Sequence, residues 1–429
     1  MMRLELNYIT INEMQFSSMS KIHNQTLLIN KKELEDLILK DEHIQSVELD
    51  IARPGESVRI TPVKDVLEPR IKEQSSSGVF PGVISGVETV GSGRTNVLKG
   101  VAVVTSGRIV GFQEGIIDMS GEGAKYTPFS ETVNLVMTCH CHDSIKAHEH
   151  EKAVRYAGLR AAEYLGKLSI GIEGDSLETY ETLPLLQSVS HYPELPKVAY
   201  VQMLQSQGLL HDTYVYGVDA KHILPTLLYP TELMDGAIIS GNCVSACDKN
   251  TTYHHQNNCV IQDLFKQHGK EINFVGVVIT NENVYLADKE RSSDWTAKLV
   301  EYLGVDGVII SQEGFGNPDT DLIMNCRKIE SKGIDTVIIT DEYAGRDGAS
   351  QSLADAHQSA DAVVTGGNAN ELIVLDPMKK TIGHIEYVEK IAGGFNGNIN
   401  ENGSIVVELQ AIIGSTNELG FGKLSAKDI

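Results

Sequence analysis

The chain has 429 residues, of which 41% are hydrophobic and 22% charged, as in an ordinary globular protein that can bury a large core without disulfides or metals. Its net charge of -22 argues against nucleic acid and anionic membranes as partners, and an anionic substrate would need a locally basic pocket. We find no signal-peptide pattern and no run of roughly 20 apolar residues, so we expect a cytoplasmic protein. Its six cysteines should be thiols, ligands or catalysts rather than a disulfide framework.

The N-terminal part, residues 1–135, is predicted to be a β-rich module. The segments LELNYITI, QTLLIN, SVELDIA and ESVRITPV alternate apolar and polar positions, as half-buried strands do. The stretch KGVAVVTSGRIVGF at 99–112 predicts a hairpin with Ser106 and Gly107 at its tip. We therefore expect a small mixed β or barrel-like unit.

The second part, residues 136–242, is predicted to be an α/β segment. The stretch HEHEKAVRYAGLRAAEYLGKL at 148–168 has the apolar spacing of a helix with one buried face. The stretch LPKVAYVQML at 195–204 predicts a buried strand.

Just before this helix, CHCHDSIKAHEHEK at 139–152 concentrates cysteines and histidines. Such a set could bind a transition metal. On a strand, however, alternate positions put only half of the side chains on one face, so a solvated connection without metal is favoured. The residues are Cys139, His140, Cys141, His142, His148 and His150.

The C-terminal part, residues 243–429, alternates short apolar runs with helical patterns around 295–303 and 320–332. This alternation predicts a doubly wound, mostly parallel sheet, so the fold class is α/β. Ligands of such sheets bind beyond the carboxyl ends of the strands, which makes the polar residues there candidate binding loops, with solvated loops as the alternative. The runs are FVGVVIT (274–280) before Asn281-Glu282-Asn283, DGVIIS (306–311) before Gln312-Glu313, DTVIIT (335–340) before Asp341-Glu342, and ADAVVT (360–365).

The densest chemistry lies in GNCVSACDKNTTYHHQNN at 241–258. The Cys243 thiol can attack the preceding Asn242 carbonyl in an N-to-S acyl shift, and Gly241 gives the backbone the freedom that this requires. Elimination from the resulting thioester, followed by hydrolysis, would leave a pyruvoyl group at the new N-terminus. The junction therefore predicts a self-cleaving chain.

Two histidines follow the junction, and other interpretations of the segment stay open. His254 or His255 could serve as the base for cleavage, because imidazole titrates near neutral pH. A polar surface loop is one alternative. A metal site that combines these histidines with Cys243, Cys247 and Cys259 is another, although its spacing matches no common zinc pattern.

The same segment resembles the cleavage region of the pro-protein subunit of component B in glycine reductase and its sarcosine and betaine relatives. The resemblance extends over essentially the whole chain, through long motifs in the same order. These are ARPGESVRITPVKDVLEPR (52–70), VGSGRT (90–95), GFQEGIIDMSG (111–121), LQSQGLLHDTYVYGVDAKHILPT (204–226), YPTELMDGAI (229–238), ITNENVYLADKERSSD (279–294), EGFGNPDTDLIMNC (313–326) and ITDEYAGRDGASQS (339–352).

The resemblance implies a subunit of an anaerobic, selenium-dependent amino-acid reductase that splits before Cys243 and turns this residue into a covalent pyruvoyl cofactor. The two pieces, 1–242 and 243–429, would stay together in a hetero-oligomer with a selenocysteine-containing subunit of component B. A small selenoprotein A would accept the carboxymethyl group. The implied reaction is reductive deamination of glycine, sarcosine or betaine to acetyl phosphate, with thioredoxin as the reductant.

Two groups of site residues follow from the resemblance and the local chemistry. The catalytic group is Asn242, Cys243, Cys247, His254 and His255. The substrate-binding group is Arg94, Arg346, His211 and Tyr214. The arginines are candidates because a substrate carboxylate needs a cation, and a structural role is the alternative for each.

Two rival hypotheses remain. The chain could be a self-processing N-terminal-nucleophile amidohydrolase, which would keep the free thiol and amine of Cys243. It could also be an uncleaved scaffold subunit that binds a ligand without chemistry. Only the pyruvoyl hypothesis predicts loss of the thiol and a ketone at the new terminus.

Overall fold

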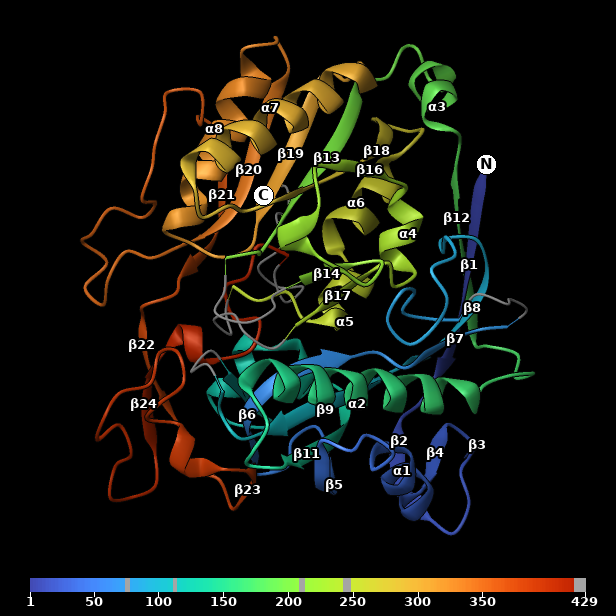
Figure 1. Cartoon of the computed structure of the whole chain (residues 1–429), viewed down its shortest axis with the longest axis vertical. Coiled ribbons are helices and arrows are strands. Elements are labelled where there is room, and N and C mark those ends of the chain that lie inside the picture. The colour runs from blue at the N-terminus through green and yellow to red at the C-terminus, as the bar shows by residue number, and fades with distance from the viewer. Residues whose placement is uncertain (74–77, 111–113, 208–212, 242–247, 420–429) are drawn as a thin grey trace.

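The computed structural model describes residues 1–73, 78–110, 114–207, 213–241 and 248–419, and Figure 1 shows its course from the N-terminal sheets to the parallel sheet. The fold is α/β, as the sequence predicts. In the part of the chain that is described, no helix is both long and apolar enough to cross a membrane.

A mixed sheet with strand order β10-β6-β9-β11-β5 forms the centre of the N-terminal part, and β23 also pairs with β6. Helix α2 lies across this sheet (Figure 1), and its buried apolar residues share one core with β9 and β11. Helix α2 lies very close to strand β9, since a Cβ added to Gly158 of α2 would be 2.7 Å from Thr105 Cγ2 of β9. The bounds are β5 (Ile44–Ala52), β6 (Val58–Leu67), β9 (Val101–Gly107), β10 (Gly115–Asp118), β11 (Val133–Cys141), α2 (Ala147–Lys167) and β23 (Lys380–Gly383).

Two smaller sheets flank this unit. One has the order β12-β1-β8-β7, and the other has the order β2-β4-β3 with helix α1 following β4. Their bounds are β1 (Met2–Thr10), β2 (Glu13–Ser17), β3 (Lys21–His23), β4 (Thr26–Asn30), α1 (Lys31–Ile38), β7 (Arg70–Lys72), β8 (Gly93–Lys99) and β12 (Ser176–Thr182).

The parallel sheet has the order β16-β18-β13-β19-β20-β21, with only β16 antiparallel to its neighbour. Helices α3, α7 and α8 pack on one face, and α4 and α6 pack on the other, so the sheet is doubly wound. The bounds are α3 (Leu185–His191), β13 (Lys197–Leu204), β16 (Thr226–Leu228), α4 (Pro230–Met234), α6 (Cys259–Gln267), β18 (Asn273–Asn281), α7 (Leu286–Leu303), β19 (Gly307–Gln312), α8 (Asn317–Glu330), β20 (Asp335–Glu342) and β21 (Val363–Asn368).

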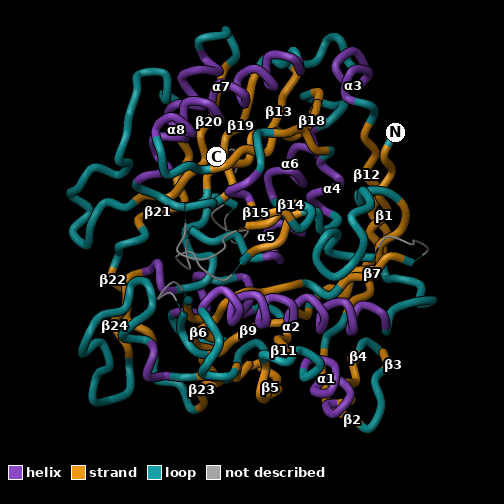
Figure 2. Tube along the Cα trace, viewed as in Figure 1, coloured by secondary structure: helices purple, strands orange, loops and turns teal. Residues whose placement is uncertain are grey.

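Strand β13 is the first parallel strand in the chain, yet it lies between the next two, β18 and β19. The strand order therefore reverses at β13, and such a switch point opens a crevice at the carboxyl ends of the strands. The segment between the two large sheets, with β14, β15, β17 and α5, lies beside this end (Figures 1 and 2). Its bounds are β14 (Thr213–Val215), β15 (Val218–Asp219), β17 (Ile238–Ser240) and α5 (Thr252–Gln256), and the remaining pair of strands is β22 (Leu372–Leu375) with β24 (Ile405–Glu408).

The parallel sheet draws strands from both sides of residue 242. Its central strand β13 precedes the junction, whereas both neighbours of β13 follow the junction. In the opposite direction, β23 from the C-terminal part pairs with β6 of the N-terminal part. The division at 242 that the sequence predicts therefore runs through one shared sheet.

The helix at 148–168 and the strands at 195–204, 274–280, 306–311 and 335–340 are confirmed. The predicted hairpin tip is wrong. Ser106 and Gly107 continue β9, where they pair with Thr138 and Cys139 of β11. The chain turns instead at Gly100, whose positive φ of 90° favours glycine and whose added Cβ would lie 2.6 Å from Ile11 O.

Candidate functional site

Polar side chains converge at the switch point of the parallel sheet. Gln205 follows β13, Glu282 follows β18 and Glu313 follows β19, and all three are at most 9% exposed. Asp341, near the end of β20, is buried beside them. The residues that follow these strands are therefore buried rather than solvated, and we call this buried polar cluster at the switch point the crevice.

The cleavage junction itself, with Asn242, Cys243 and Cys247, lies outside the described residues, as does His211. Both flanks of the junction are buried in this part of the molecule. Ser240 and Gly241 end the N-terminal flank, and Asp248 to Thr251 begin the C-terminal flank.

A clamp of hydrogen bonds joins the two flanks. The backbone N–H of Ser240 donates to Thr252 Oγ1 over 3.0 Å. The Thr252 hydroxyl donates to Asp65 Oδ2 over 2.7 Å, and its backbone N–H donates to Asp65 Oδ1 over 2.9 Å. Burial raises the pKa of Asp65, while the charge of Lys249 opposes this shift. Strand β6, which carries Asp65, therefore fixes both sides of the junction.

His254 has a capping role at the start of α5. Its Nδ1 accepts a hydrogen bond from the backbone N–H of Thr251 over 3.2 Å, and the Thr251 side chain in turn caps the helix. Because Nδ1 accepts, the neutral ring carries its proton on Nε2. Burial lowers the His254 pKa to about 3, so the ring is neutral at ordinary pH.

The ring of His255 lies instead beside Gln202 and Glu313, in the crevice. Gln202 Nε2 lies 3.3 Å from His255 Nδ1, and an amide nitrogen can only donate, so the neutral ring carries its proton on Nε2. That atom lies 3.3 Å from Glu313 Oε1, although the two atoms do not form a hydrogen bond. The other oxygen of Glu313 accepts from the Gln205 backbone N–H over 2.7 Å and from the Thr213 hydroxyl over 3.1 Å. Glu313 is thus held in position against His255.

The crevice is acidic. Burial, together with repulsion from Glu313, raises the pKa of both Glu282 and Glu418 well above the usual range. Burial and a hydrogen bond with Asp248 do the same for Asp341. These three carboxyl groups belong to residues that are 1% to 3% exposed, so bulk water is largely excluded from them. The locally basic pocket expected for an anionic substrate is not formed by these residues.

The sequence analysis missed the C-terminal contribution to this crevice. Thr416 Oγ1 donates to Asp341 Oδ2 over 3.0 Å, and Asn417 Nδ2 donates to the backbone O of Lys249 over 3.3 Å. Asn250 Nδ2 donates to Glu418 Oε1. No local pattern marks residues 416–418, because the segment is far in sequence from every other residue of the site.

The described substrate-binding candidates lie elsewhere or have partners. Arg94 is 41% exposed and pairs with Glu5 on β1 at 3.2 Å. Arg346 is 49% exposed, and its Nε donates to Glu408 over 2.7 Å. Tyr214 is buried under the Arg155 guanidinium, whose Nη2 lies 3.1 Å from the phenol oxygen. Their roles in substrate binding remain predictions.

The cysteine and histidine cluster is only partly the solvated connection that the sequence favours. His150 of α2 is buried, as are Cys139 and Cys141 of β11 in the core that β11 shares with α2, whereas His142 and His148 are exposed. Burial raises the pKa of Cys139 to about 12 and lowers that of His150 to about 3. The structure describes no group of three such side chains, here or elsewhere, with the geometry of a metal site.

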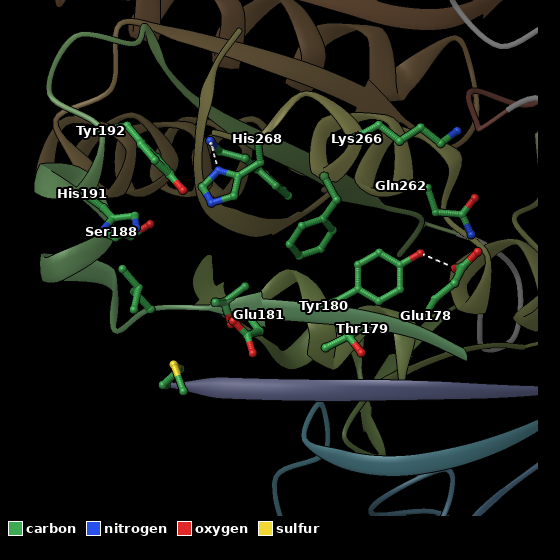
Figure 3. Close-up of a pocket in the computed structure, with 15 residues that line it drawn as sticks. Glu178, Thr179, Tyr180, Glu181, Ser188, His191, Tyr192, Gln262, Lys266 and His268 are labelled. Atoms are coloured by element: carbon green, nitrogen blue, oxygen red, sulfur yellow. Dashed lines mark hydrogen bonds between the residues drawn. The ribbon is translucent and has the colours of Figure 1, made fainter. Parts of the chain in front are cut away.

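An open pocket of about 650 Å³ lies between β12 and α6. Figure 3 shows Tyr180 and Tyr192 on its walls, with His268 beside them and the Tyr180 hydroxyl hydrogen-bonded to Glu178. None of the crevice residues and none of the residues selected from the sequence lines this pocket. The chemistry therefore concentrates at the switch point rather than in this more open cavity.

Comparison with known proteins gives matches over nearly the whole chain. A family model described as "Glycine/sarcosine/betaine reductase component B subunits" matches residues 2–427. The chain is 66% identical over 426 residues to the glycine reductase complex component B subunits alpha and beta of Peptoclostridium acidaminophilum, covering 99% of this chain and 100% of that protein. It is 57% identical to the sarcosine reductase complex component B subunit alpha of the same organism, with coverage of 99% and 100%. The identity to its betaine reductase complex component B subunit alpha is 38%, with 100% of both chains covered. No solved structure matches.

Proposed function

The chain belongs to the family of glycine/sarcosine/betaine reductase component B subunits, and from this premise we propose that it binds and activates the amine substrate of an amino-acid reductase. In this proposal the chain splits between Asn242 and Cys243, and Cys243 becomes a pyruvoyl group. The observation that carries the proposal is the burial of both flanks of this junction in one crevice, within a chain that matches the family over residues 2–427.

The residues around the junction fit such a group. When formed, the pyruvoyl group supplies an electrophilic carbonyl that can condense with an amine and draw electrons from its C–N bond. Buried polar atoms without a hydrogen-bond partner, His255 Nε2, Glu313 Oε1 and Asn417 Oδ1 among them, are available to contact it or the substrate. Unpartnered polar atoms are costly in a buried site unless a ligand or a reacting group satisfies them.

The chain's own residues then have three tasks. Asp65 and Thr252 hold the two flanks of the junction together, which keeps these flanks fixed before and after cleavage. Glu313 lies 3.3 Å from His255 Nε2, and the imidazole can take up a proton at Nδ1 when the Gln202 amide no longer donates there. The buried walls of the crevice exclude water, which strengthens each of these electrostatic interactions.

The partners remain part of the proposal. The similar glycine, sarcosine and betaine proteins are named as components of complexes, which supports a hetero-oligomer. We assign the nucleophile that displaces the amine to a selenocysteine-containing partner subunit, and the acceptor of the carboxymethyl group to a small selenoprotein. Glycine is the first substrate to test, because the highest of these identities is to a glycine reductase protein.

The test is intact-mass analysis of the denatured protein, co-expressed with its partner subunit, before and after phenylhydrazine treatment. The proposal expects two pieces dividing between residues 242 and 243, with the C-terminal piece blocked to Edman degradation and gaining mass from phenylhydrazine. The variant Cys243→Ala should give one unsplit chain without substrate-dependent activity.

Other outcomes would point elsewhere. A C-terminal piece with a free N-terminal cysteine would favour the amidohydrolase, and an unsplit wild-type chain that still binds the amine would favour the scaffold. Normal reductase activity in Cys243→Ala would refute the pyruvoyl proposal.

A further inference from the structure

The crevice contains buried carboxylate oxygens that lack a hydrogen-bond partner. Among the described residues these are Glu282 Oε1, Glu313 Oε1 and Glu418 Oε2, and the three side chains belong to residues that are 1% to 3% exposed. They come from separate elements, since Glu282 follows β18, Glu313 follows β19, and Glu418 lies in the C-terminal segment. The fold therefore brings three incompletely satisfied acceptors into one region.

Neutral side chains in the same crevice show the same pattern. Gln202 Oε1, Asn250 Oδ1 and Asn417 Oδ1 are buried, and none of them has a hydrogen-bond partner. Asn250 uses its nitrogen to bind Glu418, so its free atom is again an acceptor. These three unsatisfied amide atoms are oxygens, so they add acceptors to those of the acidic residues, although the buried Asn258 Nδ2 close by is a donor without a partner.

Such an arrangement is unfavourable without a positive group. The carboxyl groups of Glu282, Glu313 and Glu418 repel one another, and burial deprives them of water. The nearby buried Lys289 offsets part of this at Glu282, but its ammonium group already binds Asp321 and the backbone O of Asn317. A donor-rich cation would satisfy the acceptors and relieve the repulsion.

We propose that Glu282, Glu313 and Glu418 form a subsite for the ammonium group of a primary amine substrate. This inference rests on the proposed function, which places an amine in this crevice. A primary ammonium carries three N–H donors, so it can satisfy several of these acceptors at once. A trimethylammonium group has no N–H donor, so the subsite discriminates against quaternary amines.

The test measures cation binding after any ketone has been removed, so that no amine can condense with the protein. Mature complex is treated with borohydride, which reduces a ketone to an alcohol, and is then titrated calorimetrically with methylammonium chloride or tetramethylammonium chloride. We expect the wild type to bind methylammonium at least tenfold more tightly than tetramethylammonium. Glu418→Gln and Glu282→Gln should each weaken methylammonium binding at least tenfold.

The glutamine variants are close in shape to the wild type. In Glu418→Gln the remaining oxygen can still accept from Asn250, and the loss of a repelling charge should leave the melting temperature at or above that of the wild type. Glu271→Gln removes one equal charge at an exposed position outside the crevice and should bind methylammonium as the wild type does.

Several outcomes would overturn the subsite. These are undetectable methylammonium binding by the wild type, equal affinity for the two cations, or unchanged methylammonium affinity in folded Glu418→Gln and Glu282→Gln. Cleavage and phenylhydrazine labelling are measured before the borohydride step. A failure of the proposed function would therefore appear in those two measurements, and a failure of the subsite only in the titrations.

Discussion

Replacing Thr252 by valine should weaken the clamp that holds the two flanks of the cleavage junction. Valine has nearly the same shape, but it cannot accept from the Ser240 backbone N–H or donate to Asp65. A hydrogen bond to a carboxylate contributes about 1.5–3 kcal/mol, and a buried donor left without an acceptor costs about 1–3 kcal/mol. Ser240 is 1% exposed, so water cannot replace the lost acceptor.

The sum is a loss of about 2.5–6 kcal/mol in the free energy of unfolding, reduced by about 1 kcal/mol for the extra buried methyl group. The control Thr252→Ser keeps the hydroxyl and loses only a methyl group, which should cost about 1 kcal/mol. Cleavage should also slow by about tenfold or more in Thr252→Val, because a small displacement of the reacting groups is costly.

Urea denaturation followed by the fluorescence of the single tryptophan, Trp295 on α7, measures the first effect. A time course of fragment formation on denaturing gels measures the second effect. Equal destabilisation by valine and serine would show that packing of the side chain, rather than its hydroxyl group, holds the flanks together. Cleavage of Thr252→Val at the wild-type rate would contradict the role of the clamp in cleavage.

Further predictions concern the fragments, the histidines and the pH dependence. After cleavage the two pieces should elute together under native conditions and separate only in denaturant, because β13 of one piece lies between β18 and β19 of the other; a C-terminal piece that elutes alone would contradict this. His254→Gln should still cleave, since glutamine can replace the capping acceptor at this position, whereas His255→Gln should cleave slowly, and the opposite order would reverse the assignment. Burial raises the pKa of the Glu418 carboxyl, so the folded protein is stabilised by the protonated form of this group. This stabilisation is complete below the unfolded pKa of about 4.3 and is lost as the pH rises through the folded pKa. The unfolding free energy of Glu418→Gln should therefore exceed that of the wild type by an amount that grows with pH, and urea titrations that give a constant difference would refute this linkage.

The sequence by itself determined the elements whose cause is local. The helix at 148–168 forms because its apolar residues recur with the helical period and pack on β9 and β11. The runs at 274–280, 306–311 and 335–340 form parallel strands because β-branched, apolar residues suit the interior of a sheet that is covered by helices. Strand β18 is buried throughout, and in β20 only Asp335 and Val337 are exposed. The placement of polar residues at the carboxyl ends of these strands was likewise predictable, since the direction of the chain decides where a strand ends.

The order of the strands and the contacts between residues distant in the sequence were decided only by the tertiary structure. The contacts of Asp65 with Thr252 and of Glu418 with Asn250 join residues that are 187 and 168 positions apart, so no local sequence pattern predicts these contacts. The prediction of a hairpin tip at Ser106 and Gly107 was wrong for a related reason. Pairing with β11 extends β9 through these two residues, although their local sequence is typical of a turn.

The roles of the adjacent residues His254 and His255 could also not be predicted from the sequence. As adjacent residues of equal chemistry they could not be told apart from the sequence. Successive positions on a helix point about 100° apart. One ring therefore turns back to cap α5 at Thr251, and the other reaches Glu313, a partner that only the strand order of the parallel sheet supplies.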